Sequence, residues 1–223
     1  MNKHIISIEG NIGAGKSTFI NILNTYLTDS QIVPEPVELW KNILDTDGSN
    51  ILQKYYNDIS RWAYTFQNLA YISRMTKIED TIRTSNSKFI LLDRSLSTDK
   101  YVFEKMLYDT KNISEIEHQI YNLWYDFYYK YVRPEFHSTI IYLRCDPQIA
   151  LTRIKKRGRI EEQHIDIKYL NDLHNYHEKW LLETPNQNVI IVDSNKDFEF
   201  DLINQSYIMK TLVEKINKIN ICK

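Results

Sequence analysis

Short apolar runs recur along the chain, and a segment with helical periodicity follows each of them. Four runs are almost continuously apolar: residues 4–8, 88–92, 139–143 and 188–192. Continuous rather than alternating apolar character is typical of strands in a parallel sheet that is covered on both faces. A weaker fifth strand is predicted at residues 31–33, where Pro34 ends the extended run.

The segments between these runs have the 3.6-residue period of amphipathic helices. They cover residues 16–27, 50–83, 97–107, 114–131, 147–156, 167–182 and 198–216. Strands that alternate with helices predict an α/β fold, here a five-stranded parallel sheet flanked by helices and joined by right-handed crossovers. Ligands of such sheets bind beyond the carboxyl ends of the strands, so the residues directly after each strand are the candidates for chemistry.

Composition limits the classes of function. The 223 residues carry a formal net charge of −1, and 43% of them are hydrophobic. This length favours one domain that spans residues 1–223. A near-neutral chain is not expected to bind nucleic acid or an anionic membrane surface. Two cysteines are too few for a disulfide framework, and no signal, transit or transmembrane segment is recognisable, so a cytoplasmic protein is expected.

One motif identifies a phosphate-binding loop. The run Gly10-Asn11-Ile12-Gly13-Ala14-Gly15-Lys16-Ser17 matches G-x-x-x-x-G-K-[ST], and it lies between a predicted strand and a predicted helix, as this motif requires. Its backbone N–H groups surround phosphate oxygens, Lys16 reaches the β- and γ-phosphates, and the Ser17 hydroxyl is a ligand of Mg²⁺. The predicted ATP-binding residues here are Gly10, Asn11, Gly13, Ala14, Gly15, Lys16, Ser17 and Thr18. The motif alone does not separate kinases from GTPases or ATPases.

Charged residues follow two other strands. Asp93 ends the strand at 88–92, where a carboxylate binds Mg²⁺ directly or through water, unless it only caps the next helix. Arg94 follows it and is expected to point toward the same cleft. Glu35 lies between two prolines that stiffen the backbone, which suits a general base for a hydroxyl nucleophile, although a loop carboxylate is by itself unremarkable.

Three arginines cluster near the end of the helix at 147–156. Arg153 and Arg157 share a helix face, and Arg159 follows Gly158. Such a cluster can close over ATP and neutralise charge on the transferred phosphoryl group, so a short arginine-rich lid is predicted at about 153–163. The alternative is a solvated basic helix end.

With these residues in place, the chain resembles the deoxyribonucleoside kinases of the deoxycytidine kinase and deoxyguanosine kinase type. The similar stretches run from residue 5 to about 183. They are Ile8-Glu9-Gly10-Asn11-Ile12, Ser17-Thr18, Val33-Pro34-Glu35-Pro36-Val37, Arg61-Trp62, Thr65-Phe66-Gln67, Arg94-Ser95, Arg157-Gly158-Arg159, Glu161-Glu162-Gln163 and His177-Glu178-Lys179-Trp180-Leu181-Leu182.

The resemblance implies a P-loop kinase that uses ATP and Mg²⁺ to phosphorylate the 5′-hydroxyl of a deoxyribonucleoside, in nucleotide salvage, as a homodimer. It implies that Glu35 is the general base, that Arg94 positions it, and that Lys16 completes the catalytic set. The other implied substrate-binding residues contact the sugar (Tyr56, Glu162), pair with the base edge (Gln67) or form the base slot (Ile12, Trp40, Leu52, Phe66, Ala70, Phe103).

Arg74 and Asp99 are the positions that the resemblance links to base choice, as a charged pair beside the base. A carboxylate there favours a base with an exocyclic amino group, so deoxycytidine or a purine deoxynucleoside is expected to be preferred over thymidine, with the order among the three left open. A structural salt bridge away from the substrate is the alternative.

Two departures and two rivals qualify the resemblance. Close cellular members carry Glu at the position of Asp93, so the shorter side chain here could reach Mg²⁺ through water. The sequence shows no long N-terminal extension, so mitochondrial import is not expected. A GTPase would need an intact guanine-reading motif, which Asn195-Lys196-Asp197 does not provide. A nucleoside monophosphate kinase would use Arg74 and Arg94 for a substrate phosphate.

Overall fold

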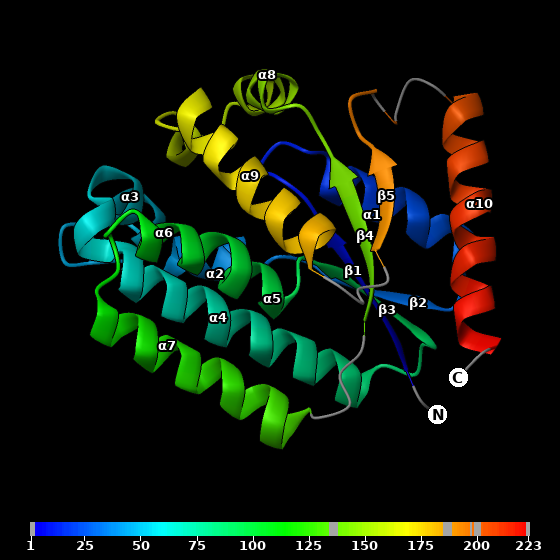
Figure 1. The fold of residues 1–223 in the computed structure, drawn as a ribbon, viewed down its shortest axis with the longest axis horizontal. Helices are drawn as coiled ribbons and strands as arrows, with labels where there is room; N and C mark the ends of the chain where they lie inside the picture. The colour runs from blue at the N-terminus through cyan, green and yellow to red at the C-terminus, as the bar shows by residue number, and fades with distance from the viewer. Residues whose placement is uncertain (1–2, 134–137, 185–188, 197, 199–201, 222–223) are drawn as a thin grey trace.

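A five-stranded parallel sheet forms the centre of the molecule (Figure 1). The computed structural model describes residues 3–133, 138–184, 189–196, 198 and 202–221. The strands are β1 (His4–Glu9), β2 (Ser30–Val33), β3 (Phe89–Asp93), β4 (Ser138–Arg144) and β5 (Val189–Asp193), in the spatial order β2-β3-β1-β4-β5. Every neighbouring pair is parallel. All five predicted strands are confirmed, each to within one residue at either end.

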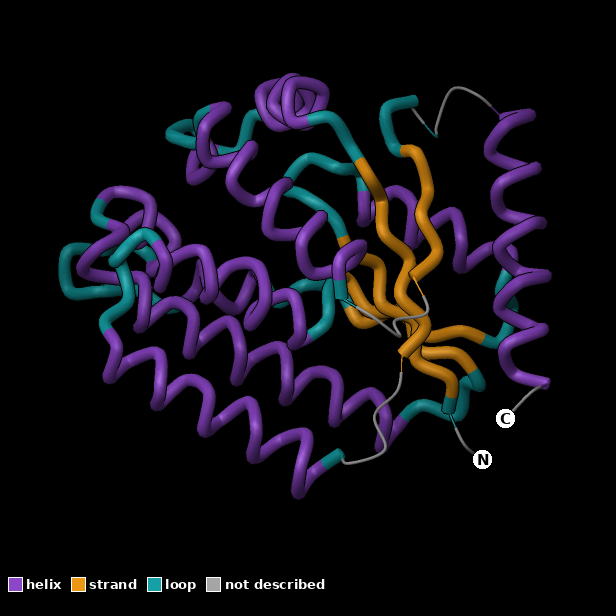
Figure 2. The backbone as a smooth tube through the Cα atoms, in the orientation of Figure 1, coloured by secondary structure: helices purple, strands orange, loops and turns teal. Residues whose placement is uncertain are grey.

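Helices cover both faces of the sheet, as the continuously apolar strands predicted (Figure 2). Alternate side chains of a strand point to opposite faces. Ile6 and Ile8 of β1 therefore pack with α1 (Lys16–Tyr26) and α10 (Leu202–Ile221), whereas Ile5 packs with residues of α4 (Ile59–Thr84) and α7 (Glu115–Phe127). In Figure 1, α10 lies on one side of the sheet, and α4 and α7 lie on the other.

The remaining helices surround the carboxyl end of the sheet. They are α2 (Val37–Asn42), α3 (Ile51–Asn57), α5 (Leu96–Thr98), α6 (Lys105–Asp109), α8 (Pro147–Arg157) and α9 (Ile167–Glu183). Two π-helical segments, η1 (Asp99–Glu104) and η2 (Tyr128–Val132), lie within the predicted helices 97–107 and 114–131, and a 3₁₀ turn, η3 (Ile160–Glu162), follows α8. No helix in the described part of the chain is long and apolar enough to cross a membrane.

The helices differ from the sequence prediction at three places. The predicted single helix at 50–83 is two helices, because Asp58 has a non-helical backbone (φ −146°, ψ 83°) and its side chain accepts a hydrogen bond from Arg61 N at 3.1 Å, which starts α4. The helix expected at 198–216 is α10, which extends further, to Ile221; residues 199–201 of its expected start lie outside the described residues. The sequence pattern gave no sign of α2, whose six residues are too few to display a helical period.

The strand register brings the candidate residues to one edge of the sheet. Ile8 of β1 pairs with Asp93 of β3, and Val33 of β2 pairs with Leu92 of β3. The phosphate loop after β1, the Asp93-Arg94 turn after β3 and Glu35 after β2 therefore emerge side by side.

Candidate active site

The phosphate loop connects β1 to α1 in a conformation that requires glycine. Gly13 has a φ of +79°, and a Cβ atom there would lie 2.4 Å from the carbonyl oxygen of Ala150 in α8. Gly15 is the residue before the first turn of α1 and has a φ of +87°. The free backbone N–H groups at the start of α1 make this loop a site for phosphate oxygens.

Lys16 is held inside this loop. It is buried, and its ammonium donates to the backbone carbonyls of Asn11 at 2.8 Å and Gly10 at 3.2 Å. Burial, and then the nearby Arg94, lowers the pKa of Lys16 to about 7. A triphosphate in the loop would reverse this shift, since an anion favours the charged ammonium.

Asn11 shapes the loop with both ends of its amide. Its Nδ2 donates to the carbonyl of Leu170 at 2.8 Å, and its Oδ1 accepts from Ile12 N at 2.8 Å. The side chain is buried, so the first bond ties the phosphate loop to α9 and the second stabilises the turn of the loop itself.

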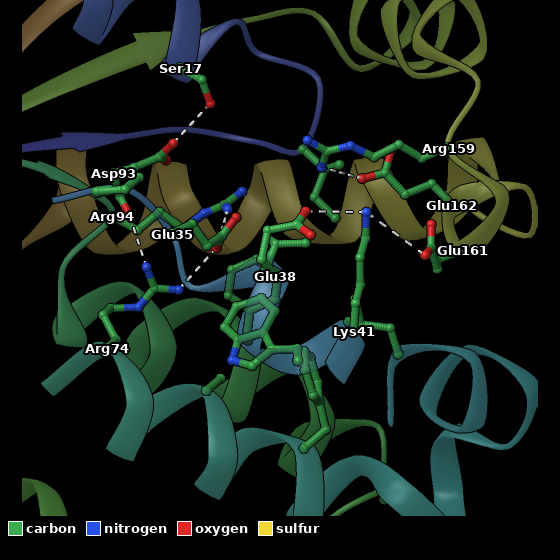
Figure 3. A pocket seen from close by; sticks show the side chains of 18 of the residues that line it. Ser17, Glu35, Glu38, Lys41, Arg74, Asp93, Arg94, Arg159, Glu161 and Glu162 are labelled. Atoms are coloured by element: carbon green, nitrogen blue, oxygen red, sulfur yellow. Dashed lines mark hydrogen bonds and ion pairs between the residues drawn. The ribbon is translucent and has the colours of Figure 1, made fainter. Parts of the chain in front are cut away.

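Ser17 and Asp93 form the candidate metal site. The Ser17 hydroxyl donates to Asp93 Oδ2 at 2.9 Å (Figure 3). The second carboxylate oxygen, Asp93 Oδ1, is buried without a hydrogen-bond partner among the described residues. A hydroxyl beside a carboxylate with a free oxygen suits Mg²⁺, which prefers oxygen ligands. The two side chains therefore fit the cation that the sequence predicts.

Glu35 is fixed through only one of its carboxylate oxygens. Oε1 accepts from Arg94 at 2.8 Å and from Arg74 at 3.0 Å (Figure 3). Oε2 has no hydrogen-bond partner among the described residues, and the side chain is 21% exposed and lines a cavity. Burial alone would raise the pKa of Glu35, but Arg94, Arg74 and Lys16 outweigh it and lower the pKa to about 2. Glu35 is thus an anion with one oxygen open to a ligand.

Arg94 adopts a backbone conformation that is unusual for a residue other than glycine. Its φ is +68°, and such strain is retained where surrounding contacts fix the turn. Glu9 supplies these contacts, because its buried carboxylate accepts from Ser95 N at 3.0 Å and from the Thr98 hydroxyl. Sequence reasoning missed this role of Glu9. The signal available was an acidic residue inside an otherwise apolar strand.

A cavity of about 300 Å³ lies between the phosphate loop, α2, α4 and the turn after β3. All the predicted substrate-binding residues line it: Ile12, Glu35, Trp40, Leu52, Tyr56, Phe66, Gln67, Ala70, Arg74, Arg94, Asp99, Phe103 and Glu162. Lys16, Ser17 and Asp93 line it as well, so the cavity is continuous with the phosphate loop and the candidate metal site.

The inner part of the cavity has the character of a slot for a planar ring. Trp40 and Phe66 meet edge to face with ring centroids 5.2 Å apart, and Trp40 Nε1 donates to the Ser73 hydroxyl. Gln67 is buried, and its Oε1 has no hydrogen-bond partner among the described residues. An unsatisfied buried amide oxygen is costly, so a ligand with a hydrogen-bond donor would stabilise the slot.

Arg74 and Asp99 form a buried ion pair in the wall of this slot. Arg74 Nε donates to Asp99 Oδ2 at 2.9 Å, and the side chains of both residues are 3% exposed. Both residues line the cavity, so the ion pair forms part of the wall of the candidate substrate site.

The outer part of the cavity meets the predicted lid. Glu162 accepts from Arg157 at 2.6 Å and from Arg159 at 3.2 Å, and it lines the cavity together with these arginines and Tyr56. Arg153 does not line the cavity. Its guanidinium donates to backbone carbonyls after β5, including that of Ser194 at 2.8 Å.

The cavity includes charged residues of α2 and the lid that sequence reasoning did not select. Lys41 lies 3.5 Å from Glu38 and 4.0 Å from Glu161 of the lid. Lys41 and Glu38 were missed because α2 itself was not predicted, whereas Glu161 lies within the predicted lid but was assigned no role there.

Comparison with known proteins identifies the family of this chain. A family model described as deoxynucleoside kinase matches residues 6–219. The chain belongs to the deoxynucleoside kinase family. It is 36% identical to deoxycytidine kinase of Homo sapiens over 96% of this chain and 89% of that protein. It is also 36% identical to deoxycytidine kinase 2 of Gallus gallus, over 92% and 87% of the two chains. Mitochondrial deoxyguanosine kinase of Xenopus laevis is 31% identical over 87% and 82%.

Membership confirms that the chain is a deoxynucleoside kinase with the P-loop kinase fold that the sequence predicted. A deoxynucleoside kinase requires a phosphate site and a nucleoside site that open onto one another. The cavity has the lining that this requirement predicts, because residues of the phosphate loop and of the aromatic slot both border it.

Proposed function

We propose that this deoxynucleoside kinase transfers the γ-phosphoryl group of ATP to the 5′-hydroxyl of a deoxyribonucleoside, in nucleotide salvage. The observation that carries the proposal is the arrangement of Glu35. Two arginines hold its Oε1, its Oε2 has no hydrogen-bond partner among the described residues, and Glu35 lines the same cavity as Lys16 and Ser17 of the phosphate loop. A carboxylate oxygen in this position can accept the proton of a hydroxyl as that hydroxyl attacks a phosphoryl group.

The chain's own residues account for the other requirements of phosphoryl transfer. Backbone N–H groups of the phosphate loop and Lys16 bind the phosphates of ATP, and Arg157 and Arg159 neutralise charge on the transferred group when the lid, residues 153–163, closes. Ser17 and Asp93 would hold Mg²⁺, which would neutralise part of the negative charge on the phosphates of ATP. Tyr56 and Glu162 lie at the lid end of the cavity, where the sugar would present its 3′-hydroxyl.

We assign Arg153 a different place from the other two lid arginines. Arg153 lies next to the phosphate loop, because a Cβ atom on Gly15 would lie 3.9 Å from Arg153 Nη1. Its guanidinium already donates to the backbone carbonyl of Ser194. In this position it supports the loop from outside the cavity.

The base slot supports a preference for bases with an exocyclic amino group. Asp99 is anionic when paired with Arg74, and a carboxylate accepts a hydrogen bond from an amino group but meets a carbonyl with repulsion. An unpaired buried polar group costs about 1–3 kcal/mol, which corresponds to roughly 10- to 100-fold discrimination. We infer that deoxycytidine or a purine deoxynucleoside is preferred over thymidine, in line with relatives named for deoxycytidine and deoxyguanosine.

One experiment tests the acceptor and a second tests the base. ATP labelled at the γ-phosphate is offered with a nucleoside, a nucleoside monophosphate or water. Transfer to the nucleoside is expected, and transfer to a monophosphate instead would reject the proposal. The four deoxynucleosides then compete for limiting enzyme, and the competition is repeated with Arg74→Met combined with Asp99→Ala. The base assignment fails if thymidine leads with the natural protein, or if the double variant gains no thymidine activity.

We also propose that the enzyme is a homodimer formed through α7. Five large apolar side chains of this helix are more than one third exposed, namely Ile116, Ile120, Leu123, Trp124 and Phe127. Tyr121 of the same helix is 1% exposed and belongs to the core beneath them. A stripe of this kind is more apolar than a monomer ordinarily presents. Sedimentation that shows only monomer at micromolar concentration would refute the dimer.

A further inference from the structure

One buried guanidinium connects the base slot to the proposed general base. Arg74 projects from α4 and donates through three different nitrogens. Nε donates to Asp99 Oδ2 at 2.9 Å, Nη1 to the backbone carbonyl of Asp93 at 2.8 Å, and Nη2 to Glu35 Oε1 at 3.0 Å. Figure 3 shows the side chain reaching from its helix toward Glu35 and Asp93.

The geometry of a guanidinium makes these three bonds dependent on one another. The group is planar and rigid, and its N–H donors point in fixed directions. Arg74 is 3% exposed, so water cannot replace a lost partner at low cost. A movement of Asp99 that breaks the bond to Nε therefore requires the whole group to rotate, and this rotation also disturbs the bond from Nη2 to Glu35.

Asp99 is the member of this network that touches the base slot. It lines the cavity beside Gln67 and Phe103, and its Oδ1 has no hydrogen-bond partner among the described residues. An amino group of the base can donate to this oxygen and leave the bond to Arg74 intact. A carbonyl oxygen at the same place repels the carboxylate, which must turn away or take up a proton.

We propose, building on the function above, that Arg74 is a positioning residue that makes the chemical step depend on the base. When Asp99 accepts a hydrogen bond from an amino group of the base, Arg74 holds Glu35 in its reactive orientation. When Asp99 meets a carbonyl oxygen of the base, Arg74 loses its bond to Glu35. Glu35 keeps its bond to Arg94 in both cases, but one bond to Oε1 leaves the carboxylate free to rotate about it. Selection between bases then appears in the rate of phosphoryl transfer as well as in nucleoside affinity.

The electrostatics of the pair support this coupling. Burial raises the pKa of Asp99, although Arg74 opposes the shift. A carbonyl placed against Asp99 favours its protonated form further, because a protonated carboxyl can donate to a carbonyl. Protonation removes the charge that holds the Nε end of Arg74.

The experiment compares deoxycytidine with deoxyuridine, whose rings differ in the 4-substituent, an amino group or a carbonyl, and in the proton that N3 of uracil carries. Single-turnover rates are measured by rapid quenching at saturating concentrations of each nucleoside. The natural enzyme is expected to transfer the phosphoryl group about 10- to 100-fold faster to deoxycytidine, the range expected when a reacting group is slightly misplaced. Deoxyadenosine and deoxyinosine give the same comparison for a purine.

Variants separate positioning from simple contact. Arg74→Lys keeps the charge, but a single ammonium cannot hold three acceptors in fork geometry, so the two saturating rates should become equal to within about twofold. Arg74→Met combined with Asp99→Ala should equalise the two rates as well. This double variant replaces Arg74→Lys if the single variant does not fold, because removing both members of the ion pair leaves neither as an unpaired buried charge. The contrasting variant is Gln67→Met, which alters a base contact without touching Glu35. It should weaken nucleoside binding and keep the difference in saturating rates.

The outcomes are distinct. If the natural enzyme has equal saturating rates and the two nucleosides differ only in KM, Arg74 does not relay base identity, while the proposed kinase activity stands. If Arg74→Lys is folded and retains the natural rate ratio, the relay is also refuted. If no nucleoside accepts a phosphoryl group from ATP, the proposed function itself fails.

Discussion

Replacing Glu35 with glutamine tests the central chemical assignment with little change in shape. The amide oxygen can take the place of Oε1 and accept from Arg94 and Arg74, whose bonds to the carboxylate are 2.8 and 3.0 Å long. The amide nitrogen takes the place of Oε2 and cannot accept a proton. Nucleoside binding should therefore persist, while the transfer step loses its base.

A positioned general base accelerates a reaction by about 10²- to 10⁴-fold, and this range sets the expected loss of rate. We expect Glu35→Gln to slow single-turnover transfer by about 10²-fold or more, which corresponds to about 2.7 kcal/mol in the activation barrier. Glu38→Gln is the matched control, since Glu38 borders the same cavity but its side chain is 84% exposed, and its rate should stay within about twofold of the natural one. An unchanged rate in folded Glu35→Gln would show that this carboxylate is structural.

Two further predictions concern buried titrating groups. Because burial, and then Arg94, lowers the pKa of Lys16 to about 7, ATP binding at pH 8 should take up close to one proton, measurable by calorimetry in buffers of different ionisation enthalpy. Lys16→Arg should take up none because arginine stays charged, and absence of uptake in the natural enzyme would contradict the prediction. Burial lowers the pKa of His177 to about 3 from 6.5, so the unfolded state binds this proton first and stability falls as pH drops from 6.5 toward 3. Between pH 7 and 5 His177 should lower the free energy of unfolding by about 2 kcal/mol. Urea unfolding at the two pH values should show a loss larger by this amount in the natural protein than in His177→Gln. Equal losses in both proteins would refute the prediction.

The parallel sheet was predictable because its strands are buried on both faces. Such strands appear as short continuous apolar runs, and their order of occurrence gives the α/β class. Helix ends were less predictable, since they depend on single side chains. The break at Asp58 depends on one capping bond, and the motif that makes it, an acidic residue three positions before Arg61, also occurs inside continuous helices.

Parts of the candidate site were predictable because their residue types follow directly after predicted strands. Glu35, Asp93 and the phosphate loop are of this kind, and the register places them together. An acidic residue at the end of an apolar strand marks Glu9 as unusual, but its partners Ser95 and Thr98 were not predictable. The bonds from Arg74 to Glu35 and to the Asp93 carbonyl were not predictable either, because they depend on distances between elements that no sequence period specifies. Asp99 and Phe103 lie in the π-helical segment η1, a departure from the 3.6-residue period that is frequent at functional sites.

The low pKa of Glu35 raises the question of how so weak a base assists the reaction. A base with a pKa of about 2 gives little driving force for early proton removal. In a loose transition state the attacking hydroxyl is only slightly bonded to phosphorus, so its proton becomes acidic late and a strong base is not required. Orientation then matters more than basicity. Orientation and basicity predict opposite changes in the transfer rate when Arg74 is lost. The loss raises the basicity of Glu35, since Arg74 lowers its pKa. It also removes one of the two hydrogen bonds that fix Oε1 of Glu35. If basicity limited the transfer, the variant without Arg74 would be faster with every nucleoside. Because orientation limits it, that variant should be slower with deoxycytidine.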